Sequence, residues 1–409
     1  MFSHLERPER PPPGWRRVLA DFGLTYAANG FIGWVFAATA PVAIILAAGT
    51  SGGLSESELA SWIFGVFFIN GWISILFCWL YRQPLAFFWT IPGTVLVGPA
   101  LAHLSFAQVI GAYLVTGLLI LALGVSGWVR RAMQVVPMPI VMGMVAGVFL
   151  RFGLDLVRAL HNDFAIAGPM VGSYLLLFAL PALGRRIPPL IGALLVGAAA
   201  TALFGRVDAA ALGTIELVRP VLYVPAWSLA AMIELVVPLA ITVLVVQNGQ
   251  GFAVLKAAGH APPVDAVTVA CGVGSILGAL VGSVSTCLTG PTNAIITSSG
   301  DRSRHYTAGI FTGVLAVAFG LLAPAFTRLM LIAPKSFIMV LAGLAMLRVL
   351  QSAFVASFKY RFTLGALVSF LVTVADLAVL NIGAAFWGLA AGFAVSWYLE
   401  RHDFAASCR

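Results

Sequence analysis

The sequence predicts an all-α polytopic membrane protein with fourteen transmembrane segments, arranged as two inverted repeats of seven with one broken helix in each. Three observations predict this fold. Of the 409 residues, 61% are hydrophobic and only 9% are charged, whereas soluble domains are about 25% charged. Apolar stretches of membrane-spanning length recur from residue 24 to residue 399. Two similar interruptions, Thr90-Ile91-Pro92 and Thr289-Gly290-Pro291, lie 199 residues apart.

Glycine, proline and charged residues divide the apolar sequence into segments, each close to the roughly 20 residues that a helix needs to span a bilayer. The predicted segments are 24–48, 57–80, 84–103, 106–128, 137–158, 169–184, 188–204, 229–255, 265–284, 286–300, 306–329, 334–354, 362–379 and 382–399. The first repeat is therefore 24–204 and the second is 229–399, joined by a connection at 205–228. Residues 1–23 and 400–409 are predicted to be terminal tails.

The basic residues predict the orientation of these segments. The chain has 23 Lys and Arg residues and a net charge of +8. With the N-terminus in the cytoplasm, sixteen of them fall in cytoplasmic connections, six fall outside, and Arg348 lies within a span. This bias follows the positive-inside rule, so both termini are expected in the cytoplasm. The basic residues form no patch with interleaved aromatics, which argues against a nucleic-acid partner.

Two further pairs of landmarks recur at nearly the same offset. The run Pro41-Val42-Ala43-Ile44 matches Pro238-Leu239-Ala240-Ile241, 197 residues later. Ala146-Gly147 with Leu150-Arg151 resembles Ala342-Gly343 with Leu347-Arg348, 196 residues later. With the pair of interruptions this makes a repeat of seven spans. Because seven is odd, the second copy enters the membrane from the opposite side, which makes the repeat inverted.

Each interruption is expected to be a short extended strand followed by a helix that begins near a proline. The first strand covers Phe87-Phe88-Trp89 before Pro92, and the second covers Cys287-Leu288 before Pro291. Both helix N-termini should then lie near the midplane and face each other. Each presents free backbone N–H groups and about half a positive charge. Two such termini beside a cavity form a natural anion site.

The residue types near this centre also favour an anion, because no Asp or Glu lies close to it in sequence. Amide, hydroxyl and aromatic side chains supply the candidate contacts. Their alternative roles are packing, capping of the half-helices and hydrogen bonding between helices. The candidate substrate-binding residues are Tyr26, Asn29, Phe87, Trp89, Thr90, Gly93, Thr94, Gln247, Asn248, Gln250, Thr292 and Asn293.

Few acids lie in or near the predicted spans, and such acids mark functional candidates. Asp376 and Glu234 are the candidates for proton coupling, although Asp376 would serve equally as an acid paired inside the bundle. Asp155 and Arg158 are expected to form a local ion pair. The four cysteines have no metal spacing, and no phosphate loop or hydrolase motif is present, so neither a metal nor a cofactor is expected.

Several motifs spread over most of the chain resemble the benzoate:proton symporter (BenE) family. The family is related to the nucleobase and sulfate/bicarbonate transporters, which share a seven-plus-seven inverted-repeat fold. The matching runs are Tyr81-Arg82-Gln83-Pro84, Trp89-Thr90-Ile91-Pro92-Gly93, Ala146-Gly147-Val148-Phe149-Leu150-Arg151-Phe152-Gly153-Leu154, Gln247-Asn248, Lys256-Ala257-Ala258-Gly259 and Gly383-Ala384-Ala385-Phe386-Trp387-Gly388-Leu389.

The resemblance implies a secondary active transporter of the bacterial inner membrane, working by an elevator-like movement and often as a homodimer. It implies a core domain of 24–128 plus 229–329 and a gate domain of 137–204 plus 334–399. The substrate would be benzoate or a related aromatic carboxylate, imported with a proton and bound between the third and tenth spans. The half-helix residues would hold the carboxylate, the amides of the eighth span would orient it, and the aromatic residues would contact the ring.

Two departures keep other substrates open. The second break has Thr292-Asn293 where family members have small apolar residues, which weakens the assignment to benzoate itself. Nucleobase relatives have a glutamate near the position of Gln247, so its absence argues against a copied nucleobase site. The alternatives are a uracil- or xanthine-like nucleobase with a proton, and an inorganic anion. A membrane enzyme is disfavoured because no nucleophile–base pair stands out.

Overall fold

The structure is a computed structural model that describes residues 5–129, 131, 137–180, 187, 189–204, 216–298, 300–377, 379 and 384–407. Residues 205–215 of the predicted repeat connection lie outside the described residues, as does Gly383 of the last family motif.

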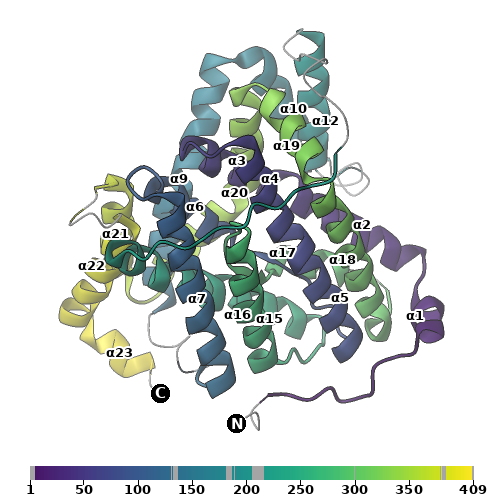
Figure 1. The fold of residues 1–409 in the computed structure, drawn as a ribbon. Helices are drawn as coiled ribbons and strands as arrows, with labels where there is room; N and C mark the ends of the chain where they lie inside the picture. Colours follow the sequence, from purple (N-terminus) through teal and green to yellow (C-terminus); the bar gives the residue numbers. More distant parts are fainter. Residues whose placement is uncertain are drawn as a thin grey trace.

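The first half of the chain is helical except for one short strand (Figure 1). Its elements are α1 (Trp15–Asp21), α2 (Leu24–Ala38), α3 (Ala40–Ser51), α4 (Glu56–Phe64), the π-helical turn η1 (Gly65–Ile69), α5 (Asn70–Tyr81), β1 (Phe87–Trp89), α6 (Ile91–Ala100), α7 (Phe106–Ser126), α9 (Met138–Asn162), α10 (Phe164–Ala179) and α12 (Pro189–Leu203).

The second half repeats this pattern of helices around one strand. Its elements are α13 (Leu229–Ala231), the π-helical turn η3 (Met232–Val236), α14 (Val237–Ile241), the π-helical turn η4 (Thr242–Asn248), α15 (Gly249–Ala257), α16 (Val264–Leu280), β2 (Thr286–Leu288), α17 (Gly290–Ile296), the 3₁₀ turn η5 (Arg302–Arg304), α18 (His305–Leu321), α19 (Ala323–Ile332), α20 (Lys335–Phe358), α21 (Thr363–Ala375), α22 (Ala384–Leu399) and α23 (Arg401–Ser407).

Helices occupy every predicted span, and in 84–103 and 286–300 a strand precedes the helix. Over the described residues, six helical stretches are long and apolar enough to cross a membrane, or seven if a bent pair counts as one span. Six further apolar helices have 10 to 17 residues. The mostly helical, polytopic membrane class is therefore confirmed, while fourteen complete crossings stay a prediction.

Two predicted spans are not single helices, and a proline follows each break. The range 24–48 breaks at Thr39, where φ is −100° and ψ is −96°, and Pro41 is in the first turn of α3. The range 306–329 divides into α18 and α19, which meet at 70° with Pro324 in the first turn of α19. Proline lacks the N–H donor and clashes with the preceding turn, so it ends one helix and starts another.

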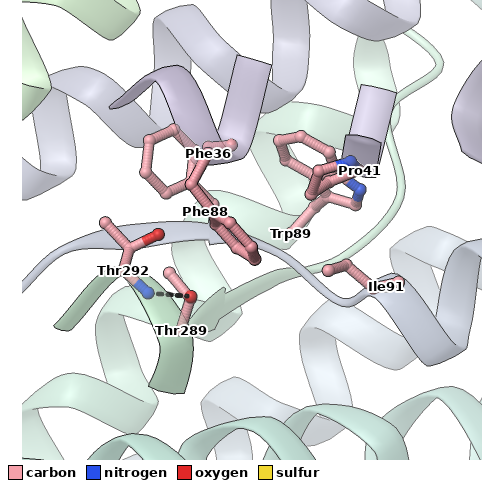
Figure 2. A pocket seen from close by; sticks show the side chains of 8 residues that line it. Phe36, Pro41, Phe88, Trp89, Ile91, Thr289 and Thr292 are labelled. Atoms are coloured by element: carbon pink, nitrogen blue, oxygen red, sulfur yellow. Dashed lines mark hydrogen bonds between the residues drawn. The ribbon is translucent and has the colours of Figure 1, made fainter. Parts of the chain in front are cut away.

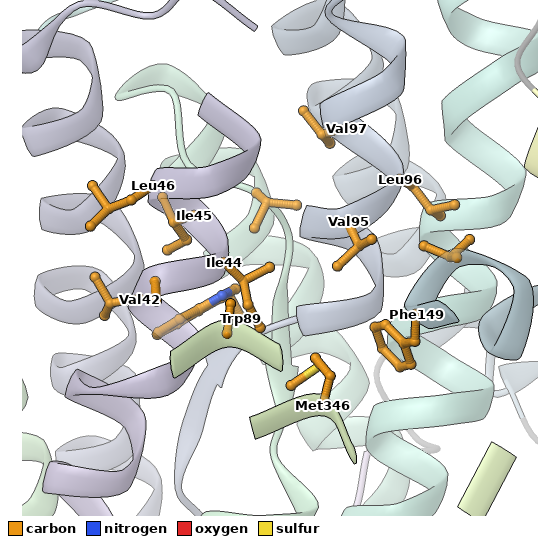
Figure 3. Close-up of a cluster of buried hydrophobic side chains, with 14 of the residues drawn as sticks. Val42, Ile44, Ile45, Leu46, Trp89, Val95, Leu96, Val97, Phe149 and Met346 are labelled. Atoms are coloured by element: carbon orange, nitrogen blue, oxygen red, sulfur yellow. The ribbon is translucent and has the colours of Figure 1, made fainter. Parts of the chain in front are cut away.

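The helices pack in two groups that meet along one seam. In one group α7 packs on α16, and α18 packs on α2 and α5. In the other, α9 packs on α20 and α21, α21 packs on α22, and α10 packs on α12. Along the seam, α3 contacts α20 and α6 contacts α9. Buried aliphatic side chains fill this junction (Figure 3), with Val95, Leu96 and Val97 of α6 near Phe149 of α9 and Met346 of α20.

The described part of the repeat connection, residues 216–228, crosses one face of the first group of helices (Figure 1). It is fixed there by backbone hydrogen bonds to the ends of three helices. The threading from the sequence predicts that these three ends lie on the same side of the membrane. The bonds run from Val218 N to Leu321 O, from Tyr223 N to Leu280 O and from Ala226 N to Ala107 O, at 2.9, 3.0 and 2.9 Å.

Candidate functional site

The two interruptions meet as a pair of antiparallel strands within the helices. Phe87 lies opposite Leu288, and Trp89 lies opposite Thr286. The residue that follows each strand extends the ladder, because Thr90 N donates to Ser285 O at 3.0 Å and Thr289 N donates to Ala86 O at 3.2 Å. Helices α6 and α17 therefore start from opposite ends of one small sheet, as two copies related by an inverted repeat would.

Side chains satisfy the outer edges of this sheet, because lipid tails cannot hydrogen-bond to exposed backbone. Ser74 Oγ accepts from Phe87 N at 2.8 Å, and Ser275 Oγ accepts from Thr286 N at 3.0 Å. The two serines precede their strands by similar distances in the sequence, so they are a further landmark of the repeat. The closed hydrogen-bond pattern makes extended backbone possible at this depth.

Thr90 caps α6 and consumes most of the free backbone donors at its start. Gly93 N donates to Thr90 Oγ1 at 3.1 Å, and Thr94 N donates to Thr90 O at 2.9 Å. Pro92 has no N–H to offer. The Thr90 hydroxyl in turn donates to Thr242 Oγ1 at 2.9 Å. Of the several free N–H groups expected at this terminus, the N–H of Ile91 therefore remains.

The start of α17 follows the same plan. Thr292 N donates to Thr289 Oγ1 at 3.5 Å, and Pro291 holds the same helical position as the proline of α6. At these two helix starts, the backbone N–H groups of Ile91 and Gly290 have no acceptor among the described residues. Each terminus keeps its partial positive charge from the helix dipole, so the electrostatic preference for an anion remains.

A small cavity lies between the paired strands and the break in α2 and α3 (Figure 2). It measures about 10 Å³, which is room for about one water molecule. Apolar groups dominate its wall, and no charged side chain lines it. The lining residues are Phe36, Ala37, Pro41, Phe88, Trp89, Ile91, Thr289 and Thr292.

Two polar groups of the wall are available to a ligand. The Trp89 Nε1–H is buried, with no acceptor among the described residues. The Thr292 hydroxyl has no hydrogen-bond partner in the described structure, and its residue is 1% exposed. In Figure 2 Thr292 and Trp89 lie on either side of Phe88. The cavity therefore combines aromatic surface with hydroxyl and indole donors.

Both predicted asparagines are engaged by the protein backbone. Asn293 accepts from Ala86 N at 3.0 Å and donates to Ala86 O and Thr289 O at 3.1 and 2.5 Å. Asn248 Oδ1 accepts from Leu288 N at 2.7 Å and so satisfies an outer edge of β2. Their amides tie the breaks together, and little hydrogen-bonding capacity is left for a ligand.

The other predicted polar residues lie around the cavity rather than in its wall. Gln247 is 5% exposed and contacts the Cys287 thiol. Gln250 packs against Gly290 at the start of α17. Gly93 faces Leu239, and Thr94 Oγ1 donates to Thr90 O at 3.0 Å.

Three predicted residues lie apart from the cavity. Phe87 is buried on the other side of β1, with its ring 5.2 Å from that of Phe77, and Phe88 takes the place expected for it. Tyr26 accepts from Asp301 N at 2.8 Å and lies under the Arg304 guanidinium. Asn29 is buried in α2 below the break. All three support the walls rather than the cavity.

Three acids predicted in or near the spans, Glu234, Asp376 and Asp155, are paired. His103 Nε2 and Glu234 Oε2 are 2.9 Å apart, and Glu234 is 5% exposed. Asp376 forms an ion pair with Arg151 in which both side chains are about half exposed. The expected pair of Asp155 with Arg158 is confirmed at 2.9 Å. Among the described residues, no group of three potential metal ligands is found.

Sequence reasoning missed the part of the wall that comes from the first span. Phe36 and Ala37 carry no signal beyond their apolar character. Pro41 was visible as a repeat landmark, and its role as a helix breaker next to the centre could have placed it in the site. Phe88 is the neighbour of the predicted Phe87, and successive side chains of a strand point to opposite faces. The sequence does not show which of the two faces the cavity.

Paired strands and two helix starts that meet inside an apolar helix bundle are the arrangement expected of a membrane transport protein. The chain belongs to the family described as benzoate membrane transport protein, whose sequence profile matches residues 20–398. The resemblance seen in the sequence is thereby confirmed. The family is one of transporters, so the protein is a transporter and not an enzyme.

Two characterised bacterial sequences are similar along nearly their whole length. The inner membrane protein YdcO of Escherichia coli (strain K12) is 30% identical over 367 residues, which are 89% of this chain and 93% of that protein. The benzoate membrane transport protein of Acinetobacter baylyi (strain ATCC 33305 / BD413 / ADP1) is 26% identical over 379 residues, which are 91% and 94% of the two chains.

Solved structures share the fold at low sequence identity. The transmembrane domain of the cyanobacterial bicarbonate transporter BicA matches with a TM-score of 0.59 at 17% identity, over 93% of this chain and 99% of that one. The structure of SLC26A9 matches with a TM-score of 0.64 at 14% identity, over 93% of this chain and 66% of that one. Murine Slc26a9, an anion transporter in the inward-facing state, matches with a TM-score of 0.57 at 13% identity, over 97% of this chain and 73% of that one.

Proposed function

We propose that the protein is a secondary active transporter that carries benzoate or a related small aromatic carboxylate together with a proton. The observation that carries the proposal is the cavity between the two broken helices. It joins three aromatic side chains and two helix N-termini in a wall without a charged side chain. Such a wall favours an aromatic ring and a single negative charge over a cation.

In this proposal the carboxylate lies between the starts of α6 and α17. The Thr292 hydroxyl and the N–H groups of Ile91 and Gly290 are its donors, and each hydrogen bond to a charged group contributes about 1.5–3 kcal/mol. The ring lies against Phe88 and Trp89. The remaining predicted residues hold these groups in place, as Thr90, Gly93, Thr94, Gln247, Asn248, Gln250 and Asn293 do around the strands.

A cavity of about 10 Å³ is closed to benzoate, so transport requires the walls to separate. We propose that the core domain, 24–128 plus 229–329, moves as a unit against the gate domain, 137–204 plus 334–399. The packing supports this division, because the helices of each group contact one another along most of their length and meet the other group at the seam of α3, α6, α9 and α20.

The wider setting follows from the relatives and the charges. The E. coli relative is an inner membrane protein and the A. baylyi relative is a benzoate transport protein, which supports a bacterial inner membrane and this substrate class. The distribution of Lys and Arg supports cytoplasmic termini. The proposal also includes a homodimer, for which the resemblance to the family is the support. Glu234 is the better candidate for the coupled proton, since Asp376 is half exposed and ion-paired.

Ligand-induced thermal stabilisation of the purified protein tests the substrate class. The panel is benzoate, benzamide, cyclohexanecarboxylate, uracil, xanthine and bicarbonate. Benzoate should raise the melting temperature most, benzamide should fail because it lacks the charge, and cyclohexanecarboxylate should be weaker because it lacks the aromatic ring. Stabilisation by uracil or xanthine alone would establish a nucleobase carrier instead. Stabilisation by bicarbonate alone would establish an inorganic anion carrier.

A further inference from the structure

A second cavity lies on the face of the molecule that carries the N-terminus, apart from the paired strands. It measures about 340 Å³, within the size range of sites for small organic ligands. Its wall joins four segments that are distant in sequence: the N-terminal segment, the turn after α5, the turn between α15 and α16, and η5. The transport proposal assigns no role to this cavity.

The N-terminal segment, residues 5–14, closes one side of the cavity, and we call it the N-terminal strap. In Figure 1 it runs past the ends of α15, α16 and α5 before reaching α1. The Glu6 carboxylate accepts from the backbone N–H groups of Asp265 and Ala266 at 3.1–3.2 Å, at the start of α16. Tyr81 Oη donates to Glu6 O at 2.9 Å. These bonds hold the strap in one place.

The wall carries a surplus of positive charge. Arg10 comes from the strap, Arg82 from the turn after α5, and Arg302 from η5, against the single carboxylate of Glu9. None of the three arginines has a carboxylate within 4 Å among the described residues, although such pairs occur elsewhere in the structure. Three guanidinium groups converging on one cavity are therefore left without a counter-charge of their own.

Two further titratable side chains, Tyr81 and His260, line the wall, and neither adds a charge at pH 7. His260 is 7% exposed, and its Nε2 lies 3.2 Å from His305 Nδ1. Burial, with His305 and Arg302 close by, lowers the pKa of His260 to about 4. At pH 7 the wall carries two more positive than negative charges. A phosphate monoester, with nearly two negative charges at pH 7, neutralises that surplus, and the phosphodiester of a lipid headgroup neutralises half of it.

We propose that this cavity binds a phosphate group, carried by a small metabolite or by a lipid headgroup, and that the bound phosphate links the strap to the body of the transporter. Guanidinium groups recognise phosphate oxygens by paired hydrogen bonds. Arg10 reaches the ligand from the strap, and Arg82 and Arg302 reach it from the body. The proposal does not depend on which anion is transported.

Two binding measurements on the full-length protein distinguish the sources. In uncharged detergent, titration calorimetry with inorganic phosphate tests a free ligand. In nanodiscs, the melting temperature in phosphatidylglycerol is compared with that in phosphatidylcholine, which tests a headgroup. The proposal expects binding in at least one arm. Binding in the first arm indicates a soluble phosphate compound, and stabilisation in the second alone indicates a lipid. Absence of an effect in both arms would overturn the proposal.

Variants locate the effect. Arg82→Gln and Arg302→Gln should each weaken phosphate binding about tenfold or more, the loss expected for one hydrogen bond to a charged group, or remove the stabilisation by phosphatidylglycerol. Arg16→Gln, in an exposed position on α1, is the matched control and should change neither. Because Arg302 is also exposed, its variant keeps the test valid if Arg82→Gln fails to fold. Equal losses in Arg16→Gln would show a general surface effect and contradict the site.

Discussion

Single residues around the cavity fall into two kinds that predict different mutant behaviour. The Trp89 indole N–H has no acceptor in the described structure, and Thr292 lines the cavity with only its backbone N–H in a hydrogen bond among the described residues. Asn293 and Thr90, in contrast, hold backbone groups of the breaks. Substitution of the first kind should change binding with little effect on stability, and substitution of the second kind should change stability first.

Thr292→Val is predicted to weaken benzoate binding about tenfold, because it removes one hydrogen bond to a carboxylate, worth about 1.5–3 kcal/mol. The melting temperature should stay the same, since the hydroxyl bonds nothing in the protein. Titration calorimetry measures the affinity. Thr116→Val is the matched control, because Thr116 Oγ1 bonds to Ala112 O within α7. An unchanged affinity in Thr292→Val would remove this hydroxyl from the site.

Asn293→Ala is predicted to destabilise the protein by about 2 kcal/mol or more, because it leaves the buried Ala86 N–H without its acceptor and removes the amide's hydrogen bonds to Ala86 O and Thr289 O. Thermal unfolding in detergent measures the loss. Asn162→Ala, at an exposed position near the end of α9, should leave stability unchanged. A variant that unfolds at the wild-type temperature but no longer binds benzoate would instead show direct contact with the substrate.

His260 predicts a dependence of stability on pH. Its lowered pKa of about 4, against 6.5 ordinarily, means that the unfolded chain takes up a proton between these values that the folded chain does not. Stability is therefore complete above pH 6.5 and falls as the pH drops toward 4. His260→Gln should lose less melting temperature between pH 7 and 4.5 than the wild type. Equal losses of melting temperature in His260→Gln and the wild type would contradict this prediction. It would also be contradicted if His161→Gln reduced the loss as much as His260→Gln does.

At the scale of elements, the starts of the helices were predictable and their partners were not. Threonine followed two residues later by proline fixes an N-cap and a first helical turn through local chemistry, so both strand–helix breaks could be placed from the sequence. The roles of Asn248 and Asn293 depend on groups 40 and 207 residues away. The bend between α18 and α19 was missed because the hydropathy continues across it.

Close helix packing gives a prediction at this scale. A methyl group at Gly30 of α2 would lie 2.7 Å from Ala308 O of α18, where backbone cannot easily move. Gly30→Ala should therefore cost about 1–3 kcal/mol through overpacking and lower the melting temperature. Gly172→Ala, on α10 with no atom within 4 Å of the added group, should keep or slightly raise it. Similar losses for both variants would show that the close contact with Ala308 O does not cause the effect.

At the scale of the whole molecule, the halves are organised around one centre that the sequence located through its repeat. Both breaks, both capping threonines and both edge serines recur in the two halves. The part of the cavity wall that comes from α2, Phe36 and Ala37, could not be predicted, since it depends on how α2 packs against α17. The N-terminal strap and the repeat connection bind different ends of the helices, and neither lines the central cavity. The proposed movement of the core domain against the gate domain can therefore leave both in place.

The proposed proton coupling involves more than the cavity itself, because the Glu234 carboxylate and the cavity lie near opposite ends of α6. Ile91 starts the helix at the cavity, and His103, just beyond its end, contacts Glu234. Glu234→Gln is predicted to abolish benzoate-driven acidification of proteoliposomes while exchange of labelled benzoate continues. Asp155→Asn, which breaks only a local ion pair on α9, should couple as the wild type does. Protein-free vesicles correct for diffusion of benzoic acid. Normal acidification by Glu234→Gln would exclude this residue and direct the test to Asp376→Asn.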